Sequence, residues 1–185
     1  GRNERKNIYC GAIPDPGGRG VELHVATQWL HEDRAQIAAC LGLREESVRL
    51  VLGGVGGAFG AREDISLQVH TCLLALRLGR PVRIAYSRAE SFLGHVHRHP
   101  ATIWMRHHAT RDGEIVKIEA RMVFDGGAYA STSSAVLINA VTHAQGSYRC
   151  PNAVVDGWAV RTNHLPCGAM RGFAVVPARF AHESQ

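Results

Sequence analysis

The chain has little lysine, few aromatic residues and no long apolar run. Only two of its 21 basic residues are lysine, Lys6 and Lys117, and aromatic residues make up 6% of the sequence. A nucleic-acid-binding protein is expected to show a basic face with interleaved aromatics, and this sequence has no such stripe. No apolar run approaches the roughly 18 residues that span a bilayer, and GRNERKNIYC leads into no apolar segment typical of a signal peptide. We therefore expect neither nucleic-acid binding nor a membrane location.

The cysteines form no CxxC pair. They are five in number, at positions 10, 40, 72, 150 and 167. These spacings do not suit an iron–sulfur cluster, and they fit a reducing, cytoplasmic compartment best. Cys40 and Cys72 fall within apolar helical patterns, where cysteine usually behaves as a small buried hydrophobe.

The composition is that of an ordinary soluble globular protein. The chain has 185 residues, of which 45% are apolar and 20% charged, with a formal net charge of +5. Residues 1–20 are rich in glycine, proline and charge, which predicts a linker or an exposed N-terminal segment. Apolar residues recur at helical or strand spacing throughout residues 21–185, so we expect one domain there. The missing initiator methionine and a last helix that stops at Gln185 suggest that this domain is partial and truncated at its C-terminus.

Hydrophobic periodicity predicts an α+β fold of mixed sheets with packed helices. Strands are expected at 21–27, 48–52 and 82–86, and a hairpin at 101–110 and 114–124 with Asp112-Gly113 in its turn. In the second arm of the hairpin, residues 116, 118, 120, 122 and 124 form an apolar face, opposite charged residues at 117, 119 and 121. Helices are expected at about 32–41, from 65 to just before Gly79, within 135–145 and at 175–183.

A glycine-rich segment at 53–60, GGVGGAFG, is the strongest local signal. Five glycines in eight residues, between an expected strand and an expected helix, allow positive φ angles and a close approach to a ligand. Successive N–H groups in such a turn can bind an anion, and the following helix adds its positive end. A tight strand-to-helix connection without a ligand remains the alternative. Phe59 stands where GxGxxG needs its third glycine, and no Gly-Lys-Ser/Thr follows for a P-loop.

The eleven histidines raise the question of a metal site. His95, His97 and His99 alternate, and alternate residues of a strand share a face. No carboxylate or cysteine completes the set locally, and Pro100 ends the run. We therefore expect packed or solvated histidines and no direct metal ligand. His107 and His108 should point to opposite faces.

Taken with its surroundings, the glycine segment resembles a known family. GGVGGAFGARED at 53–64 is similar to the GGGFGGKE-type segment of the xanthine dehydrogenase and aldehyde oxidase family. Thr27-Gln28 lies upstream at the family's separation, and Ala169-Met-Arg-Gly-Phe173 resembles its AFRGFG segment. The likeness covers about residues 20–185. Two further segments, GHVHRHP at 94–100 and PCGAM at 166–170, are most similar to bacterial split xanthine dehydrogenases, in which this is a separate subunit.

The resemblance implies a role for each matched residue. Gln28 would donate a hydrogen bond to an oxo group on molybdenum, and Phe59 and Gly60 would contact the cofactor through their backbones. Arg171, on the later segment, would be a further cofactor contact. Phe173, on the same segment, would stack on an aromatic substrate, and Glu63, which follows the glycines, would hydrogen-bond that substrate. Arginine and N–H donors suit a polar, phosphate-bearing pterin.

Residue type alone also allows a purely structural role for each of these residues. Glu63 and Asp64 stand where a helix is expected to begin, and acids are favoured there by the helix dipole. Gln28 could end a strand at the surface, and Arg171 could form a surface ion pair. Phe173 could be ordinary core. The matched spacing favours the functional roles.

The sequence departs from the family pattern at several positions. Ala61 stands where glycine is common, and Ala174 and Pro177 replace a glycine and a glutamine. Xanthine-specific members of the family carry an arginine that pairs with the substrate. If positions are counted back from Arg171 without gaps, this sequence has Asn139 near that place. A neutral amide cannot stabilise developing negative charge as arginine does. The resemblance thus implies a purine or related heterocycle more readily than xanthine itself.

The resemblance implies that the chain is the first part of a molybdopterin-binding domain of a molybdenum hydroxylase. The implied cofactor is molybdopterin with molybdenum, either as such or in its dinucleotide form. A [2Fe–2S] cluster and FAD are expected on partner subunits or domains. The subunits are expected to form a hetero-oligomer, two copies of which associate. The family's catalytic base is a glutamate in a GxGE-like segment near the subunit's C-terminus. Residues 1–185 contain no such segment, so we expect no catalytic base here and no activity from these residues alone.

Three alternatives remain. The chain could be a non-enzymatic anion- or nucleotide-binding module, an aldehyde oxidase-like member with another substrate, or an accessory subunit with vestigial cofactor residues.

Overall fold

The structure is a computed structural model that describes residues 9–185, and its contacts divide the chain into two compact units. The first unit runs to Ala58 and continues over Arg62–His95, and the second comprises Phe59–Ala61 and Val96–Gln185. The three residues Phe59–Ala61 therefore belong to the second unit although their chain neighbours belong to the first.

The first unit is a four-stranded sheet in the order β3-β2-β1-β4. Its strands are β1 (Tyr9–Pro14), β2 (Val21–Val25), β3 (Val48–Leu52) and β4 (Val82–Ala85). β1 is antiparallel to β2 and β4, and β2 is parallel to β3. A parallel pair needs a crossover connection, which α1 (Leu30–Leu41) provides.

Two helices cover this sheet and close its core. α1 ends at Gly42, whose φ of 66° is the left-handed cap that glycine favours. α2 (Gln68–Leu78) packs on β1 and β2, and its buried Cys72 meets a core that includes Leu23 and Ile37. A 3-10 turn (Glu45–Ser47) precedes β3, and α3 (Arg88–Gly94) follows β4, starting at a capping box made by Ser87 and Glu90.

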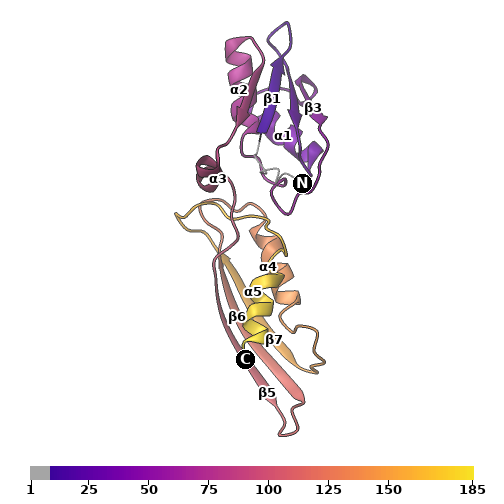
Figure 1. The fold of residues 1–185 in the computed structure, drawn as a ribbon, viewed down its shortest axis with the longest axis vertical. Coiled ribbons are helices and arrows are strands. Elements are labelled where there is room, and N and C mark those ends of the chain that lie inside the picture. Colours follow the sequence, from indigo (N-terminus) through magenta and orange to yellow (C-terminus); the bar gives the residue numbers. More distant parts are fainter. Residues whose placement is uncertain (1–8) are drawn as a thin grey trace. The chain divides into compact units, whose positions relative to one another are not determined.

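The second unit is a three-stranded sheet in the order β5-β6-β7. β5 (Ala101–Ala109) and β6 (Ile115–Asp125) form an antiparallel hairpin whose Gly113 has a φ of 88°. β7 (Ala153–Val160) is parallel to β6, and α4 (Ser133–Thr142) forms the crossover. α5 (Val175–Glu183) packs on β5 and α4, and Figure 1 shows α4 and α5 beside the same sheet.

The alternation expected in β6 accounts for the core of the second unit. Ile118, Ala120, Met122 and Phe124 are buried, and Phe124 is among the largest fully buried side chains. Val116, expected on the same face, is 37% exposed because it lies at the open end of the strand next to the hairpin turn. The α+β prediction is confirmed: the elements at 48–52 and 175–183 have the expected bounds.

Several elements differ from the sequence-based expectation. Residues 9–14 of the expected linker form β1, the strand between β2 and β4, and residues 1–8 lie outside the described residues. α3 and β7 were not expected, since their sequences carry no clear apolar period. Cys40 is exposed, whereas Cys72 is buried as predicted. That residues 21–185 are a partial domain remains a prediction.

Among residues 9–185, no helix combines the length and apolar character that crossing a membrane requires.

The packing of β6 generates the first prediction. We expect Phe124→Ala in the full-length protein to lower the free energy of unfolding by about 3–5 kcal/mol, because it opens a cavity in a closed core. Val123→Ala is the matched control: Val123 is the preceding residue on the opposite face and is 38% exposed. Its effect should stay within about 0.5 kcal/mol. Urea titration followed by tryptophan fluorescence measures both. Equal losses in the two variants would contradict the assignment of the buried face.

Candidate functional site

Hydrogen bonds in the first unit anchor the start of the glycine segment and the residue just beyond it, Arg62. The Gly53 N–H donates to the Val25 carbonyl at 3.0 Å, and the Gln28 N–H donates to the Arg62 carbonyl at 2.9 Å. The Thr27 hydroxyl also reaches the Arg62 carbonyl, at 3.4 Å. Gln28 itself is exposed just beyond β2. The end of β2 thus holds Gly53, and the residues that follow β2 hold Arg62. The Gln28 side chain remains accessible.

Between these anchors the backbone has unused hydrogen-bonding capacity. Within the part of the chain that the structure describes, none of the N–H groups of residues 54–58 donates to a protein acceptor. Gly54 and Gly56 are exposed, and a Cβ built on either would meet nothing within 4 Å. A run of accessible backbone donors is what a polar or anionic ligand requires.

In the second unit, residues 59 and 60 pack against residues 169–171. A methyl group on Gly60 would overlap the backbone of Ala169, and the φ of Gly60 is 86°. The Arg171 N–H donates to the Phe59 carbonyl at 3.0 Å. Glycine at position 60 is therefore required twice, by the left-handed backbone and by the close approach.

Arg171 and Phe59 also meet through their side chains. The Arg171 guanidinium carbon lies 5.3 Å from the centre of the Phe59 ring, within the range of a cation–π contact. Phe59 is 49% exposed, and Arg171 is exposed as well. Among residues 9–185 Arg171 has no ion-pair partner, so the alternative of a surface ion pair finds no support.

The residues after Arg171 adopt an unusual backbone. Gly172, Phe173 and Ala174 have φ angles of 86°, 41° and 68°. Left-handed backbone costs about 1–2 kcal/mol for a residue with a Cβ, so Phe173 and Ala174 are strained. The Asn139 amide donates to the Phe173 carbonyl at 2.5 Å and helps to hold this conformation. Phe173 is half-buried and packs against the core of the second unit, so it is in part a core residue.

Glu63 does not lie at a helix start. α2 begins at Gln68, five residues later, so the helix dipole cannot explain the acid at this position. Desolvation of the half-buried carboxyl, followed by the charge of Asp64, raises its pKa. A carboxyl with a raised pKa in a polar loop is suited to exchange a proton or a hydrogen bond with a ligand.

The predicted site residues divide between the two units. Phe59, Gly60, Arg171 and Phe173 belong to the second unit, where the contacts described above join the first three. Gln28 and Glu63 belong to the first unit. Their individual roles remain predictions.

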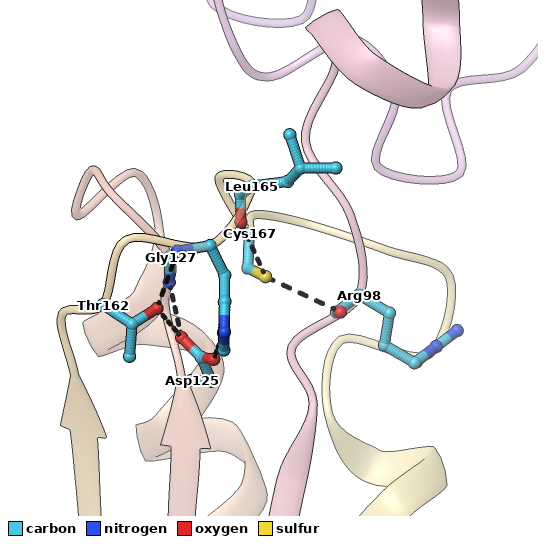
Figure 2. A network of polar contacts seen from close by, with 7 residues as sticks. Arg98, Asp125, Gly127, Thr162, Leu165 and Cys167 are labelled. Atoms are coloured by element: carbon cyan, nitrogen blue, oxygen red, sulfur yellow. Dashed lines mark hydrogen bonds and ion pairs between the residues drawn. The ribbon is translucent and has the colours of Figure 1, made fainter. Parts of the chain in front are cut away.

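A polar network at the end of β6 supports the segment that carries Arg171. The Asp125 carboxylate accepts hydrogen bonds from the Thr162 hydroxyl at 2.6 Å, His164 Nδ1 at 2.5 Å and the Gly127 N–H at 2.9 Å (Figure 2). These bonds lower the pKa of Asp125 to about 2. The same loops are joined by the Cys167 N–H, which donates to the Gly126 carbonyl at 3.0 Å.

The histidines do not assemble a metal site. Within residues 9–185, no group of three or more histidine, cysteine or acidic side chains is placed to hold a metal ion. His99 is buried with its Nε2 2.8 Å from the Ser133 hydroxyl, which makes it a packed residue. His108 contacts Glu119, while the ring centre of His107 lies 4.6 Å from that of His182 in a tilted arrangement, so these neighbours do face opposite ways.

These donors fit a molybdopterin-type ligand. In the first unit, the accessible N–H groups of residues 54–58 suit polar groups and phosphate. In the second unit, the exposed Arg171 is a cation that suits the same kinds of group. Comparison with known proteins agrees: the model of the molybdopterin cofactor-binding domain family matches residues 8–185. The chain belongs to the family of molybdopterin cofactor-binding domains.

Individual relatives are larger proteins. The chain is 38% identical over 173 residues to a probable xanthine dehydrogenase subunit of Bacillus subtilis, covering 94% of this chain and 23% of the relative. It is 40% identical over 161 residues to the nicotinate dehydrogenase large molybdopterin subunit of Eubacterium barkeri, covering 87% and 38%. A solved aldehyde oxidoreductase from Desulfovibrio gigas shares the fold, with a TM-score of 0.87 and 24% identity over 95% of this chain and 19% of that one.

Sequence reasoning missed Arg98 and the Asp125 network. Arg98 donates from Nη2 to the Arg171 carbonyl at 2.6 Å. It lies between His97 and His99 in the histidine-rich segment, where no neighbouring residue indicates a bond to residue 171. No local pattern links residue 98 or 125 to residues 162–171, because these contacts span more than 35 positions of the chain.

The close approach at Gly60 generates the second prediction. Gly60→Ala should destabilise the full-length protein by at least about 1–2 kcal/mol, the cost of a left-handed backbone for alanine, with the overlap on Ala169 added. Gly54→Ala is the control, because a Cβ there meets nothing within 4 Å. Thermal unfolding of the two variants beside wild type gives the comparison. A Gly60→Ala protein as stable as Gly54→Ala would show that residues 59–60 and 169 do not pack closely.

The Asp125 network generates the third prediction. The pKa of the Asp125 carboxyl is lowered from 3.8 to about 2. The ionised carboxylate therefore adds its full stability above pH 3.8, and this stability is lost as the pH falls through about 2. Asp125→Asn should therefore have a lower Tm than wild type at pH 7, and the difference should shrink as the pH falls through this window. Tm measured against pH tests this, with the exposed Asp156→Asn as control. A difference that does not change with pH would refute it.

Proposed function

We propose that the chain forms part of the molybdopterin site of a molybdenum hydroxylase of the xanthine dehydrogenase type. The observation that supports this most is the second-unit cluster of Phe59, Gly60 and Arg171, in which a cation and a left-handed backbone are presented at the surface. The family match over residues 8–185 supports the cofactor class. The chain spans 23% and 38% of the two relatives described above, so activity is a property of the longer protein.

When bound, the molybdenum cofactor supplies the redox chemistry of hydroxylation, in which water provides the oxygen and the substrate carbon loses two electrons and a proton. The residues of this chain bind and orient. The N–H groups of residues 54–58 and the guanidinium of Arg171 would hold polar groups of the cofactor. The exposed amide of Gln28 can donate a hydrogen bond, as the family resemblance requires.

Two residues would set the substrate. Phe173 presents a half-buried aromatic ring, held in position by the bond from Asn139 to its carbonyl. Asn139 is thereby occupied with the backbone, and it carries no positive charge to pair with an anionic substrate. Glu63, with its raised pKa, can share a proton with a ring nitrogen. We infer a purine or a related N-heterocycle as substrate, hydroxylated at an electrophilic carbon.

The partners and location follow from the same proposal. Electrons that leave the substrate would pass to [2Fe–2S] and FAD groups, which we assign to partner subunits in a hetero-oligomer. The Bacillus subtilis relative is named as one subunit of a xanthine dehydrogenase, which supports a split arrangement. The cysteine spacing supports a cytoplasmic location.

The test begins with the cofactor content of the full-length protein, purified with its partners. We expect molybdenum and pterin in near-equal amounts. In a panel of xanthine, hypoxanthine, nicotinate, quinoline and benzaldehyde, we expect oxidation of at least one of the four heterocycles. Bound phosphate without molybdenum or pterin would instead favour an anion-binding module. Neither ligand would favour an accessory subunit, and oxidation of benzaldehyde alone would favour an aldehyde oxidase-like member.

Phe173 provides the variant that tests the substrate class. Phe173→Leu keeps an apolar side chain but removes the ring, so KM for an aromatic heterocycle should rise about tenfold, equivalent to about 1.4 kcal/mol, with kcat little changed. Phe180→Leu is the control in the same unit, since Phe180 is 76% exposed on α5. Equal KM values for the two variants and wild type would show that Phe173 does not contact the substrate.

A further inference from the structure

We propose that Arg98 is a positioning residue, which fixes the backbone of Arg171 and through it the stacked Arg171–Phe59 pair. The inference rests on the proposed function, because that pair would face the cofactor. Arg98 is not itself one of the proposed cofactor contacts; it bonds to one of them, Arg171. Its side chain acts on the main chain of that residue.

The backbone of Arg98 is held beside the loop before Arg171. The His97 N–H donates to the Pro166 carbonyl at 3.0 Å, and the Gly168 N–H donates to the His97 carbonyl at 3.0 Å. Cys167 Sγ lies 3.7 Å from the Arg98 carbonyl. Figure 2 shows the Arg98 side chain extending away from Cys167 and Asp125. Two anchored segments therefore set the direction from which the guanidinium reaches Arg171.

The guanidinium completes the fixation of the Arg171 main chain. Its Nη2 donates to the Arg171 carbonyl at 2.6 Å, while the Arg171 N–H donates to the Phe59 carbonyl at 3.0 Å. Both backbone groups of Arg171 are thus bonded. A hydrogen bond from a charged donor is shorter and roughly twice as strong as a neutral one, which suits a bond that must hold a loop.

The need for such a bond comes from the strain that follows. Phe173 and Ala174 both have left-handed backbone, and residues in that region persist only where their surroundings enforce it. Two side chains bond to carbonyls of this segment: Arg98 at Arg171 and Asn139 at Phe173. Without Arg98 the N-terminal end of the strained segment would lose its side-chain restraint.

The surroundings of Arg98 favour this role over direct ligand binding. Arg98 lines a cavity of about 10 Å³ with His99, Met170 and Phe173, which has room for about one water molecule and none for a ligand ring. Its Nη1 is buried without a protein partner among the described residues. Arg98 as a whole is half-buried and its bond to Arg171 lies at the surface, so the buried Nη1 is a local cost that the bond made by Nη2 helps to offset.

The experiment compares Arg98→Gln and Arg98→Lys with wild type in the full-length protein with its partners. Arg106→Gln is the matched control, an arginine of the same unit whose guanidinium lies 5.1 Å from the Trp104 ring. Amide hydrogen exchange of residues 168–174 and the content of molybdenum and pterin are measured. We expect Arg98→Gln to exchange at least about tenfold faster and to lose about tenfold in cofactor occupancy, the usual range for outer partners of a ligand. Arg98→Lys should fall between, because lysine keeps the charge but not the planar fork.

A double variant shows whether Arg98 acts through Arg171. Arg98→Gln combined with Arg171→Gln should lose no more occupancy than Arg171→Gln alone, whereas full additivity would overturn the proposal. Wild-type exchange in Arg98→Gln would overturn it as well. If Arg98→Gln does not fold, Arg98→Lys takes its place, and a wild-type rate of amide exchange in Arg98→Lys would overturn the proposal. Absence of molybdenum and pterin from the wild type would refute the proposed function only, since the exchange readout still decides the role of Arg98.

Discussion

The close backbone contact between residues 59–60 and residues 169–171 is the constraint on which the candidate site depends. It requires a residue without a Cβ at position 60, and it lets the Arg171 N–H reach the Phe59 carbonyl. The guanidinium of Arg171 then falls over the Phe59 ring. Two segments more than 100 residues apart in the chain thereby present one polar and aromatic surface in the second unit.

Strain and its compensation explain why this surface is surrounded by polar contacts. Phe173 and Ala174 hold unfavourable left-handed backbone next to Arg171. Asn139, Arg98 and the Asp125 network all bond to this segment or to the loop that leads into it. Strained backbone held by such bonds is common where a protein must keep groups in place for a ligand before the ligand arrives.

Much of the fold could be predicted because its signals are local. The alternation along β6 and the glycines that end α1 and α2 identified those elements from short windows of sequence. β1 was missed because its glycine- and proline-containing sequence gains its strand conformation from pairing with β2 and β4. β7 was missed for a similar reason, since it pairs with β6 across a crossover. Pairing with distant strands leaves little trace in a strand's own residues.

For the site, the sequence by itself determined the family and the residue types: the glycine segment, Gln28 before it and the Arg171-Gly-Phe173 segment after it. Their order and separation carried that information. Only the tertiary structure decided that Glu63 precedes its helix by five residues, that Asn139 is bonded to the Phe173 carbonyl and that Arg98 supports Arg171. These facts depend on side chains meeting across long chain separations, where packing and hydrogen-bond geometry decide the partners and residue spacing does not.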